Sequence, residues 1–381
     1  MNIGFDAKRA YQNTTGLGHY SRTLISSLAT FFPENDYYLY TPKITNKFDI
    51  DDFVHMHALN PIGFPSAIFK RAWRSNWVKK DLLKNNINIY HGLSHEIPVG
   101  LAKKGIKSVV TIHDLIFEHY PKQYNPIDCF IYRKKIKYAC HKADKIIAIS
   151  LQTKKNLIDL YKIPENKIEV CYQSCNTSFN DNISQEKKEA VRQLYNLPQD
   201  FYLYVGSIIE RKNLLLICKA LKQVNTKLPL VVIGNGTCYK QKVKTFIAQN
   251  EITKQVIFLS EKEAAKSSST FQSSKDFPAI YQLASAMIYP SFFEGFGIPV
   301  LEALCSRLPV ITSNVSCMPE TAGDAALFVN PNSVEEMTIA MQNIITDNNL
   351  RNKLITNGIA HALKFSQQKC AQAVMSVYKN L

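Results

Sequence analysis

Two glutamates flank a glycine-rich turn in the second half of the chain. The stretch 289–302, YPSFFEGFGIPVLE, follows an apolar run that predicts a buried strand, and Pro299 predicts a helix start because its missing N–H has no partner there. Free amides at a helix start attract phosphate, and glycines let the backbone approach a ligand. Glu294 and Glu302 are eight positions apart (302 − 294), with Glu302 expected in the first helical turn, so both can accept hydrogen bonds from one ligand. Backbone amides that can bind phosphate, next to carboxylates that can bind hydroxyls, predict a site for a sugar nucleotide. The alternative is a glycine turn with two solvated acids.

Further polar groups stand at the ends of apolar runs. Arg211 and Lys212 follow the run 201–206, where cations can hold a diphosphate, although a solvated surface pair is the alternative. His113 and Asp114 stand at the end of the run 108–113, and an isolated histidine there is often a structural one.

Gly16 and Gly18 are expected to open the first long helix. Their amides could meet a phosphate or an acceptor, and a turn needed only for packing is the alternative.

Short β-rich runs alternate with helical stretches along the whole chain. This alternation indicates parallel sheets joined by right-handed crossovers, with ligands bound at the carboxyl ends of the strands. Because 381 residues exceed what one core usually fills, two successive sets predict two doubly wound α/β domains. The predicted strands are 2–5, 37–41, 87–91, 108–113, 145–150 and 167–172 in the first set, and 201–206, 228–234, 255–259, 286–290, 309–312 and 326–329 in the second.

A polar stretch at 173–200 separates the two sets of strands. It predicts an N-terminal domain of residues 1–177 and a C-terminal domain of residues 178–364. The Ser- and Lys-rich segment 261–277 predicts a mobile loop.

Composition limits the class of protein. No apolar run is as long as a membrane span, and the N-terminus starts directly with a strand, so neither a transmembrane helix nor a signal peptide is expected. Nine scattered cysteines, an odd number, suit reduced thiols and a cytoplasmic location. The net charge of +15 indicates an anionic partner: a membrane surface, a phosphorylated acceptor or nucleic acid.

Several separated motifs accompany the stretch 289–302. They are TGLGHY at 15–20, YHGLSH at 90–95, VTIHDL at 110–115, VGSIIERKNL at 205–214, PVITSN at 309–314 and PETAGDAA at 319–326. Together they resemble the GT-B retaining glycosyltransferases of family 4, particularly the bacterial mannosyltransferase-like enzymes of surface polysaccharide synthesis. The resemblance covers nearly the whole chain.

The resemblance implies a fold and a reaction. The fold is two Rossmann-like α/β domains facing across a cleft, an acceptor-binding one and a nucleotide-sugar-binding one, with residues 365–381 crossing back as a helix to the N-terminal domain. The reaction is transfer of a hexose, with mannose favoured, from a GDP-sugar or UDP-sugar to a hydroxyl of a glycan or lipid-linked acceptor. The anomeric configuration is retained, and neither a metal nor another cofactor is implied.

The resemblance also implies roles for residues. Arg211 and Lys212 neutralise the leaving nucleoside diphosphate, Glu302 binds the ribose, and Glu294 binds hydroxyls of the transferred sugar. The implied catalytic residues are His113, near the anomeric carbon, with Asp114 and Glu294. The implied donor-binding residues are Gly16, Gly18, Gly206, Arg211, Lys212, Glu294, Gly295, Phe296, Gly297, Ile298, Pro299, Val300, Leu301 and Glu302.

Two rival functions remain open at this point. A nucleotide-sugar epimerase of the same architecture would bind the donor but need no acceptor. A basic nucleic-acid-binding protein would explain the charge, yet the aromatic residues are not interleaved with basic ones as in an RNA module, so no nucleic-acid partner is expected.

Other groups could hold a metal. The segment 49–51, DID, matches an Asp-x-Asp metal pattern but lacks a preceding apolar strand, and is interpreted as a solvated acidic loop. His55 with His57, and His91 with His95, lack a third ligand and are interpreted as structural. No metal site is therefore predicted.

A basic, tryptophan-bearing stretch at 69–84 raises the question of membrane contact. Trp73 and Trp77 stand at helical spacing, and such a helix can lie at a membrane interface, here the inner leaflet of the inner membrane. A surface helix whose tryptophans pack into the domain is the alternative. The basic run 133–137 is interpreted as a solvated helix face.

Overall fold

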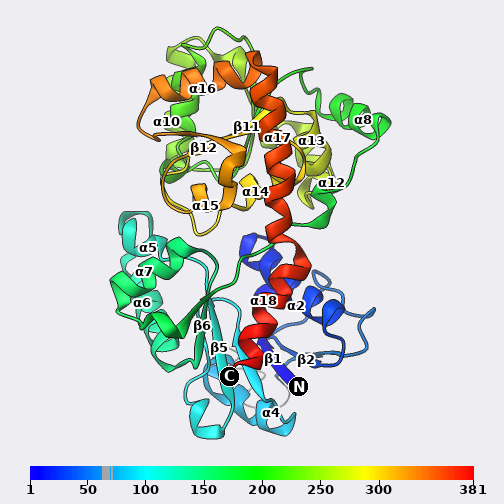
Figure 1. The fold of residues 1–381 in the computed structure, drawn as a ribbon, viewed down its shortest axis with the longest axis vertical. Helices are drawn as coiled ribbons and strands as arrows, with labels where there is room; N and C mark the ends of the chain where they lie inside the picture. The colour runs from blue at the N-terminus through cyan, green and yellow to red at the C-terminus, as the bar shows by residue number, and fades with distance from the viewer. Residues whose placement is uncertain (62–68, 70–71) are drawn as a thin grey trace. The chain divides into compact units, whose positions relative to one another are not determined.

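The computed structural model describes residues 1–61, 69 and 72–381, and these form two compact units (Figure 1). The first unit is Met1–Ser174 with Phe365–Leu381, and the second is Cys175–Lys364. The boundary predicted from the sequence lay between residues 177 and 178; the contacts place it between Ser174 and Cys175.

The first unit is built on a sheet of seven parallel strands within the described residues. Its order is β3-β2-β1-β4-β5-β6-β7, which reverses direction between β1 and β4, as in a doubly wound sheet. The strands are β1 Asn2–Asp6, β2 Asp36–Tyr40, β3 Met56–Leu59, β4 Ile89–Gly92, β5 Lys107–Ile112, β6 Lys145–Ala148 and β7 Ile168–Val170.

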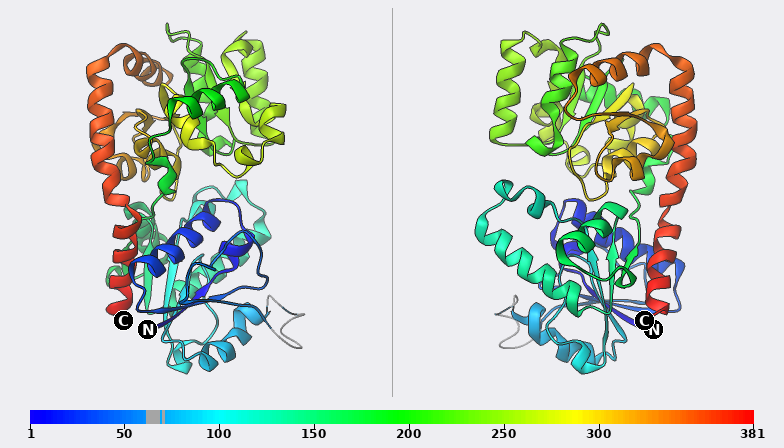
Figure 2. Two further views of the ribbon diagram at one scale, coloured as in Figure 1. Left: turned by 90° about the vertical axis from the view of Figure 1, so that its right-hand side faces the viewer. Right: turned by 60° about the vertical axis from the view of Figure 1, so that its left-hand side comes forward.

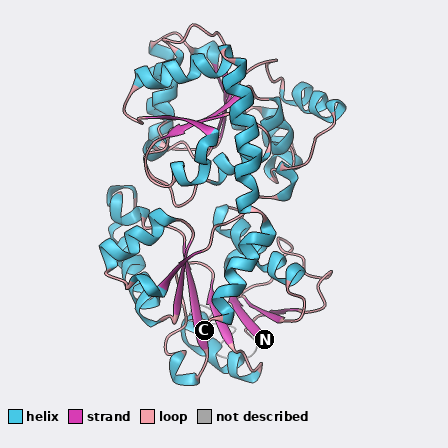
Figure 3. Ribbon diagram, in the orientation of Figure 1, coloured by secondary structure: helices cyan, strands magenta, loops and turns pink. Residues whose placement is uncertain are grey.

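Helices lie on both sides of these strands (Figure 3). The C-terminal helix α18 packs along α2, and the Tyr378 hydroxyl on α18 lies 2.5 Å from Nδ1 of the buried His91 on β4. The two chain ends therefore meet in the same unit, as both views of Figure 2 show. The helices of this unit are α1 Lys8–Gln12, α2 Gly16–Phe31, α4 Val78–Lys84, α5 Ile116–His119, α6 Pro126–Lys142, α7 Leu151–Tyr161 and α18 Gln367–Lys379.

The second unit repeats the architecture with six parallel strands among its residues. The order β10-β9-β8-β11-β12-β13 reverses direction between β8 and β11, and the strands are apolar because helices cover both faces of the sheet (Figures 1 and 3). The strands are β8 Tyr202–Val205, β9 Leu230–Ile233, β10 Val256–Phe258, β11 Ala286–Tyr289, β12 Val310–Ser313 and β13 Ala326–Val329. The helices are α8 Gln185–Tyr195, α9 Leu214–Leu221, α10 Cys238–Gln249, α11 Glu263–Ser267, α12 Ser269–Gln272, α13 Phe277–Leu283, α14 Ile298–Cys305, α15 Met318–Ala322, α16 Val334–Thr346 and α17 Asn348–Ala362.

These sheets confirm the predicted class, two doubly wound α/β domains, and each predicted strand overlaps an observed one. The sequence missed β3, an edge strand whose residues are mostly only half-buried and whose apolar pattern is therefore weak.

The prediction of a mobile loop at 261–277 is wrong. The segment forms α11 and α12 and leads into α13, and its polar residues make internal contacts. Ser268 caps α12 by accepting from the Phe271 amide, and the Asp276 carboxylate accepts from Tyr195 at 2.5 Å and from Thr270 at 2.6 Å. Hydroxyl groups in the Ser-rich composition that predicted a loop here serve as a helix cap and as hydrogen-bond donors.

Candidate active site

The candidate site of the second unit lies where the strand order reverses. Arg211 and Lys212 belong to a 3-10 turn after β8, and Glu294 belongs to the loop after β11. Because β8 and β11 are neighbours in a parallel sheet, their carboxyl ends bring these side chains together, at the position where such sheets bind ligands.

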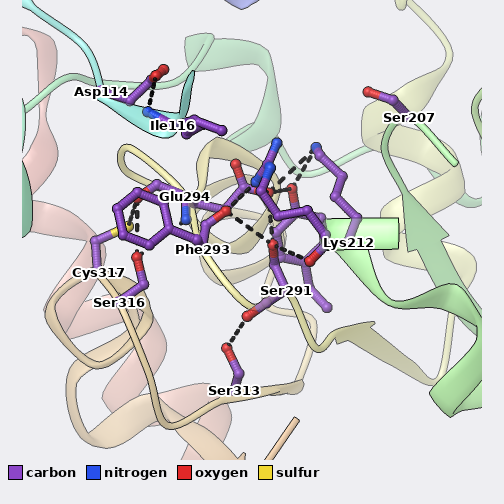
Figure 4. Close-up of polar contacts among 12 residues, drawn as sticks. Asp114, Ile116, Ser207, Lys212, Ser291, Phe293, Glu294, Ser313, Ser316 and Cys317 are labelled. Carbon is purple, nitrogen blue, oxygen red and sulfur yellow. Dashed lines mark hydrogen bonds and ion pairs between the residues drawn. The ribbon is translucent and has the colours of Figure 1, made fainter. Parts of the chain in front are cut away.

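Glu294 is the centre of a buried polar cluster (Figure 4). Its Oε1 atom lies 2.8 Å from Arg211 Nη1 and 3.7 Å from Lys212 Nζ. The same oxygen accepts from Ser291 Oγ at 2.9 Å and from the Tyr289 hydroxyl at 3.0 Å, while Lys212 donates to that hydroxyl at 2.7 Å. Two basic side chains therefore face one carboxylate oxygen in this cluster.

The environment inside the cluster shifts the pKa values of Glu294 and Lys212. Burial is the largest single influence and opposes the charge on Glu294, but Lys212, Arg211 and the Ser291 hydrogen bond together outweigh burial and hold the pKa of the carboxyl below its usual value. Burial lowers the pKa of Lys212, and Glu294 partly offsets that effect. A fixed carboxylate beside two cations can accept hydroxyl hydrogen bonds and still attract a polyanion.

The backbone around Glu294 is held from the next strand. The Ser316 hydroxyl accepts from the Glu294 amide at 3.1 Å and lies 3.1 Å from its carbonyl, and Cys317 Sγ lies 3.2 Å from that carbonyl (Figure 4). Ser313 on β12 donates to the Ser291 carbonyl at 2.5 Å. These residues, with Tyr289 and Ser291, were not assigned a role from the sequence. Tyr289 and Ser291 stood inside the stretch 289–302, and Ser313 inside the motif 309–314; Ser316 and Cys317 come from a loop after β12 whose proximity no spacing reveals.

Helix α14 starts after a left-handed glycine. Gly297 has φ 97°, a conformation that strains other residues, and a Cβ there would lie 2.6 Å from Met318 Cε, so Met318 would have to move. The helix begins at Ile298, which makes Pro299 its second residue and Glu302 its fifth. The predicted helix start at about Pro299 is therefore confirmed to within one residue, and Glu302 lies just beyond the first turn in which it was expected.

Glu302 occupies a different environment from Glu294. Its Oε2 accepts from the Tyr281 hydroxyl at 2.8 Å. Burial raises the pKa of Glu302 to about 7, although the Tyr281 hydrogen bond and Lys212 act in the opposite direction. Glu302 can therefore change charge near neutral pH.

The other residues predicted to bind the donor substrate differ in their exposure to solvent. Val300 and Leu301 are buried in the core, so their side chains are not available to a ligand, and Phe296 and Gly295 are buried beside the loop. Ile298 and Pro299 are half-buried. Gly206 has φ 154°, and a Cβ there would lie 3.0 Å from Lys212 Nζ, so it gives room to that ammonium group.

In the first unit, His113 lies just after β5 and is buried. Its Nε2 lies 2.9 Å from the Leu93 carbonyl, its amide donates to His95 Nε2 at 3.0 Å, and its carbonyl accepts from Thr153 at 3.1 Å. Burial, aided by His95, lowers the pKa of His113 to about 3, so the ring is neutral at pH 7. Since Nε2 faces a carbonyl, it carries the proton and Nδ1 is the acceptor.

Asp114 and the two early glycines also lie in the first unit. The Asp114 carboxylate accepts from the Ile116 amide at 3.0 Å (Figure 4) and lines a cavity of about 180 Å³ with Arg9, His95 and Tyr132. Gly16 is exposed at the start of α2, with open space where a Cβ would stand. A Cβ at Gly18 would lie 2.0 Å from the Asn13 carbonyl oxygen, which favours the packing interpretation for that glycine.

Other predicted polar groups lie apart from these sites. The Asp51 amide donates to Asp49 Oδ1 within an exposed turn, and His57 on β3 lies 3.6 Å from Asp36. Across residues 1–61, 69 and 72–381, no cluster of three or more His, Cys, Asp or Glu side chains is placed to hold a metal ion.

The tryptophan-bearing segment, a π-helical turn Trp73–Trp77 followed by α4, does not present the face expected for a membrane. Trp73 is buried and its indole N–H donates to Asp81 at 2.7 Å, while Trp77 packs against the same core. The structure therefore supports the packing alternative for 72–84; Lys70 and Arg71 of the predicted stretch lie outside the described residues. Within the described part, none of the helices combines the length and apolarity needed to cross a bilayer.

Comparison with known proteins matches both halves of the chain to glycosyltransferase family models. A family model described as "Glycosyltransferase Family 4" matches residues 15–179, and one described as "Glycosyl transferases group 1" matches residues 185–361. A curated relative, the O-antigen chain mannosyltransferase B of Escherichia coli, is 28% identical over the full length of both chains.

Solved structures share the fold. A glycosyltransferase from Rickettsia africae aligns with a TM-score of 0.74 at 20% identity, covering 100% of this chain and 97% of the other. Anabaena HepE in complex with UDP-glucose also gives 0.74, at 14% identity, covering 100% of this chain and 99% of the other. Neither the epimerase nor the nucleic-acid alternative is supported by these matches. The chain is a glycosyltransferase of family 4 with the GT-B fold.

Proposed function

We propose that the protein is a retaining hexosyltransferase of surface polysaccharide synthesis. In this proposal it moves a hexose, mannose favoured, from a nucleoside-diphosphate sugar to a hydroxyl of a glycan or lipid-linked acceptor. The E. coli relative, named as an O-antigen chain mannosyltransferase, supports the sugar and the pathway class. Whether the donor carries guanosine or uridine is left to the experiment below.

The observation that carries the proposal is that only one of the two carboxylate oxygens of Glu294 contacts other described residues. Its hydrogen bonds and ion pairs to described residues all reach Oε1, from Arg211, Lys212, Tyr289 and Ser291. Oε2 has no such partner within the described part of the chain, so it is available to a sugar hydroxyl. The four contacts hold the carboxylate ionised and in place for that bond.

The cations beside Glu294 would stabilise the leaving group. Departure of a nucleoside diphosphate builds negative charge on the β-phosphate, and preorganised donors at that point lower the barrier most. Lys212, with Arg211 behind it, is suited to that charge. The start of α14 offers little more, because Pro299 has no N–H and the Val300 and Leu301 amides already donate to the Gly297 carbonyl. Glu302, in its own environment, would bind the ribose hydroxyls.

His113 would act as a neutral hydrogen-bonding group. Its Nδ1 can accept from a hydroxyl of the sugar, and its depressed pKa keeps a positive charge away from a carbon that becomes electron-deficient. The role is positional, because an imidazole with a pKa of about 3 is a poor general base at neutral pH.

A ligand panel followed by product analysis tests the proposal. GDP, UDP and their hexose conjugates are screened by thermal shift, since a bound ligand raises apparent stability by mass action. The stabilising donor is then incubated with a synthetic lipid-linked saccharide, with and without EDTA, and the new linkage is assigned by NMR. We expect stabilisation by one base, an axial linkage from an axial donor, and turnover unaffected by EDTA.

Several outcomes would contradict the proposal. Stabilisation by none of the nucleotides would reject the donor site. An inverted linkage would reject retention, and donor conversion without transfer would reject the transferase. Loss of turnover in EDTA that manganese restores would reject the metal-independent reaction.

A further inference from the structure

His95, in the first unit, has an unusual backbone conformation. Its φ is 65°, in the left-handed region that residues other than glycine seldom adopt, and residues in such strained conformations are concentrated at functional sites. The His95 amide donates to the Thr111 carbonyl on β5 at 3.0 Å. A Cβ at Gly92 would lie 1.9 Å from the Glu96 carbonyl oxygen, so the turn 92–96 closes tightly on itself. These contacts hold His95 in the strained conformation and fix the position of its ring.

The His95 ring packs on the His113 ring and binds the His113 backbone. The two rings stack with their centroids 5.4 Å apart and an angle of 19° between their planes. His95 Nε2 accepts from the His113 amide at 3.0 Å, and because an amide nitrogen can only donate, Nε2 carries no proton. Burial lowers the pKa of His95 to about 4, so the ring is neutral at pH 7 and its single N–H proton is on Nδ1.

The Nδ1–H group of His95 is a donor that the described residues do not use. Nδ1 has no hydrogen-bond partner among them, and it is not one of the fully buried side-chain atoms of these residues that lack a partner. The group is therefore accessible to solvent. His95 lines the cavity of about 180 Å³ to which Asp114 also contributes. A donor that is fixed in place and left unsatisfied is suited to bind a ligand in this cavity.

The other side chains around the cavity indicate the class of that ligand. Arg9 and Lys135 are basic, and Asp114 and Glu96 are acidic, so the two kinds are present in equal number. This balance favours a neutral ligand over a diphosphate. Apolar walls with a few fixed polar groups are typical of small-molecule sites, and a saccharide offers apolar ring faces as well as hydroxyls. The aromatic residues of the wall are Phe117, Tyr124 and Tyr132.

We propose that His95 binds the acceptor saccharide of the transfer reaction. Its Nδ1–H donates to a hydroxyl oxygen of the acceptor, and the same hydroxyl donates to the Asp114 carboxylate. Asp114 can accept this bond in addition to the one from the Ile116 amide, because a carboxylate offers several acceptor positions. The identity of the ligand rests on the proposed function, in which the acceptor is a glycan hydroxyl; the unsatisfied donor and the cavity do not depend on it.

Two substitutions separate the roles of the two ring nitrogens. His95→Gln places an amide oxygen at the position of Nε2, which keeps the bond from the His113 amide and removes the donor at Nδ1. His95→Asn places an amide nitrogen near Nδ1, which keeps the donor and removes the partner of the His113 amide. Asparagine also tolerates a φ of 65°. A histidine that only supports His113 is replaced better by glutamine, and one that binds a ligand is replaced better by asparagine.

Initial rates with the synthetic lipid-linked saccharide of the product assay distinguish these cases. At saturating donor, we expect His95→Gln to raise the KM for the saccharide about tenfold, since a hydrogen bond to the ligand is lost. His95→Asn should keep that KM within about twofold. Both variants should keep the thermal shift with nucleotide. The control His55→Gln, the same change at an exposed histidine, should alter neither the KM nor the shift.

NMR of the unmodified protein with isotope-labelled histidine gives a second measurement. The Nδ1 signal of His95, assigned by its loss in either variant, should move when the saccharide is added, and the signals of exposed His55 should not. This measurement reports on the native ring and does not require a variant to be active.

Three results would overturn the assignment of His95. One is an unchanged KM for the saccharide in His95→Gln. Another is a KM in His95→Asn that rises as much as in His95→Gln, because the retained donor would then have no effect. The third is a Nδ1 signal that stays in place at saturating saccharide. Failure of the proposed function is a different result, in which the unmodified protein transfers no hexose to the saccharide.

Discussion

Glu294 and Glu302 are the same residue type on either side of one turn, yet the fold gives them opposite properties. Glu294 faces Arg211 and Lys212, which hold its pKa below the usual value. Glu302 faces Tyr281, and burial raises its pKa to about 7. The difference shows that the site combines a permanent charge beside the expected diphosphate position with a titratable one further along α14.

Glu294→Gln should produce the largest effect. It leaves two buried cations without their carboxylate, which costs about 3 kcal/mol of stability, and it removes a charged hydrogen bond to the sugar, which lowers turnover roughly 100-fold. Thermal unfolding and initial-rate assays measure the two effects. Exposed Glu335→Gln is the control and should change neither. Normal turnover in Glu294→Gln would remove the basis of the proposed function.

Glu302→Gln should have a smaller effect that depends on pH. At pH 8 the loss of the carboxylate should weaken donor affinity about tenfold. At pH 6 it should change affinity little, because Glu302 is then mostly protonated. Stability should not fall, since Gln keeps a partner for Tyr281 without a buried charge. Calorimetric titration at both pH values checks this, and an equal loss at both would contradict the raised pKa.

The unmodified protein should show the same titration. Donor affinity should rise by about tenfold between pH 6 and pH 8 as Glu302 ionises. The free energy of unfolding should instead fall as the pH rises. Because the folded pKa is raised from its ordinary 4.5 to about 7, the contribution of Glu302 is complete below about 4.5 and is lost as the pH rises through about 7. Chemical denaturation of the unmodified protein and of Glu302→Gln from pH 4 to pH 8 isolates the contribution of Glu302 to the free energy of unfolding.

Tyr281→Phe should produce the smallest effect. The Tyr281 hydrogen bond lowers the pKa of Glu302, so its removal should move the midpoint of the affinity profile to higher pH and weaken donor affinity at pH 7 about twofold. Tyr202→Phe, which also removes a buried tyrosine hydroxyl, is a control outside the site and should leave the midpoint unchanged. A midpoint that stays in place in Tyr281→Phe would show that burial alone sets the pKa.

The sequence predicted the strands well and the contacts between them poorly. Apolar runs such as Ala286–Tyr289 mark buried parallel strands directly, which is why both doubly wound sheets were expected. The sequence assigned Arg211 and Glu294 separately to a ligand, but it contained no sign that they pair with each other at 2.8 Å. That contact depends on β8 and β11 being neighbours, a property of the strand order and not of any local spacing.

Where the structure differs from the sequence predictions, the reason is local. The serines of 261–277 have the composition of a loop, yet Ser268 caps a helix. Pro299 is equally acceptable at the first or second helical residue, so it could not fix the start of α14 or the turn that holds Glu302. Trp73 and Trp77 had the spacing of an interfacial helix, and only the packed core shows that Trp73 faces inward.

Helix α18 has a consequence for how the chain is made. The second unit is continuous, so all of its residues have been synthesised once Lys364 has been added. The first unit lacks α18 until after the whole second unit has been synthesised, and with it the Tyr378 hydroxyl that meets His91 inside its core. Of the two units, the one whose synthesis begins first is therefore the later to acquire all its described residues, and His91 reaches its native surroundings only after the second unit has been made.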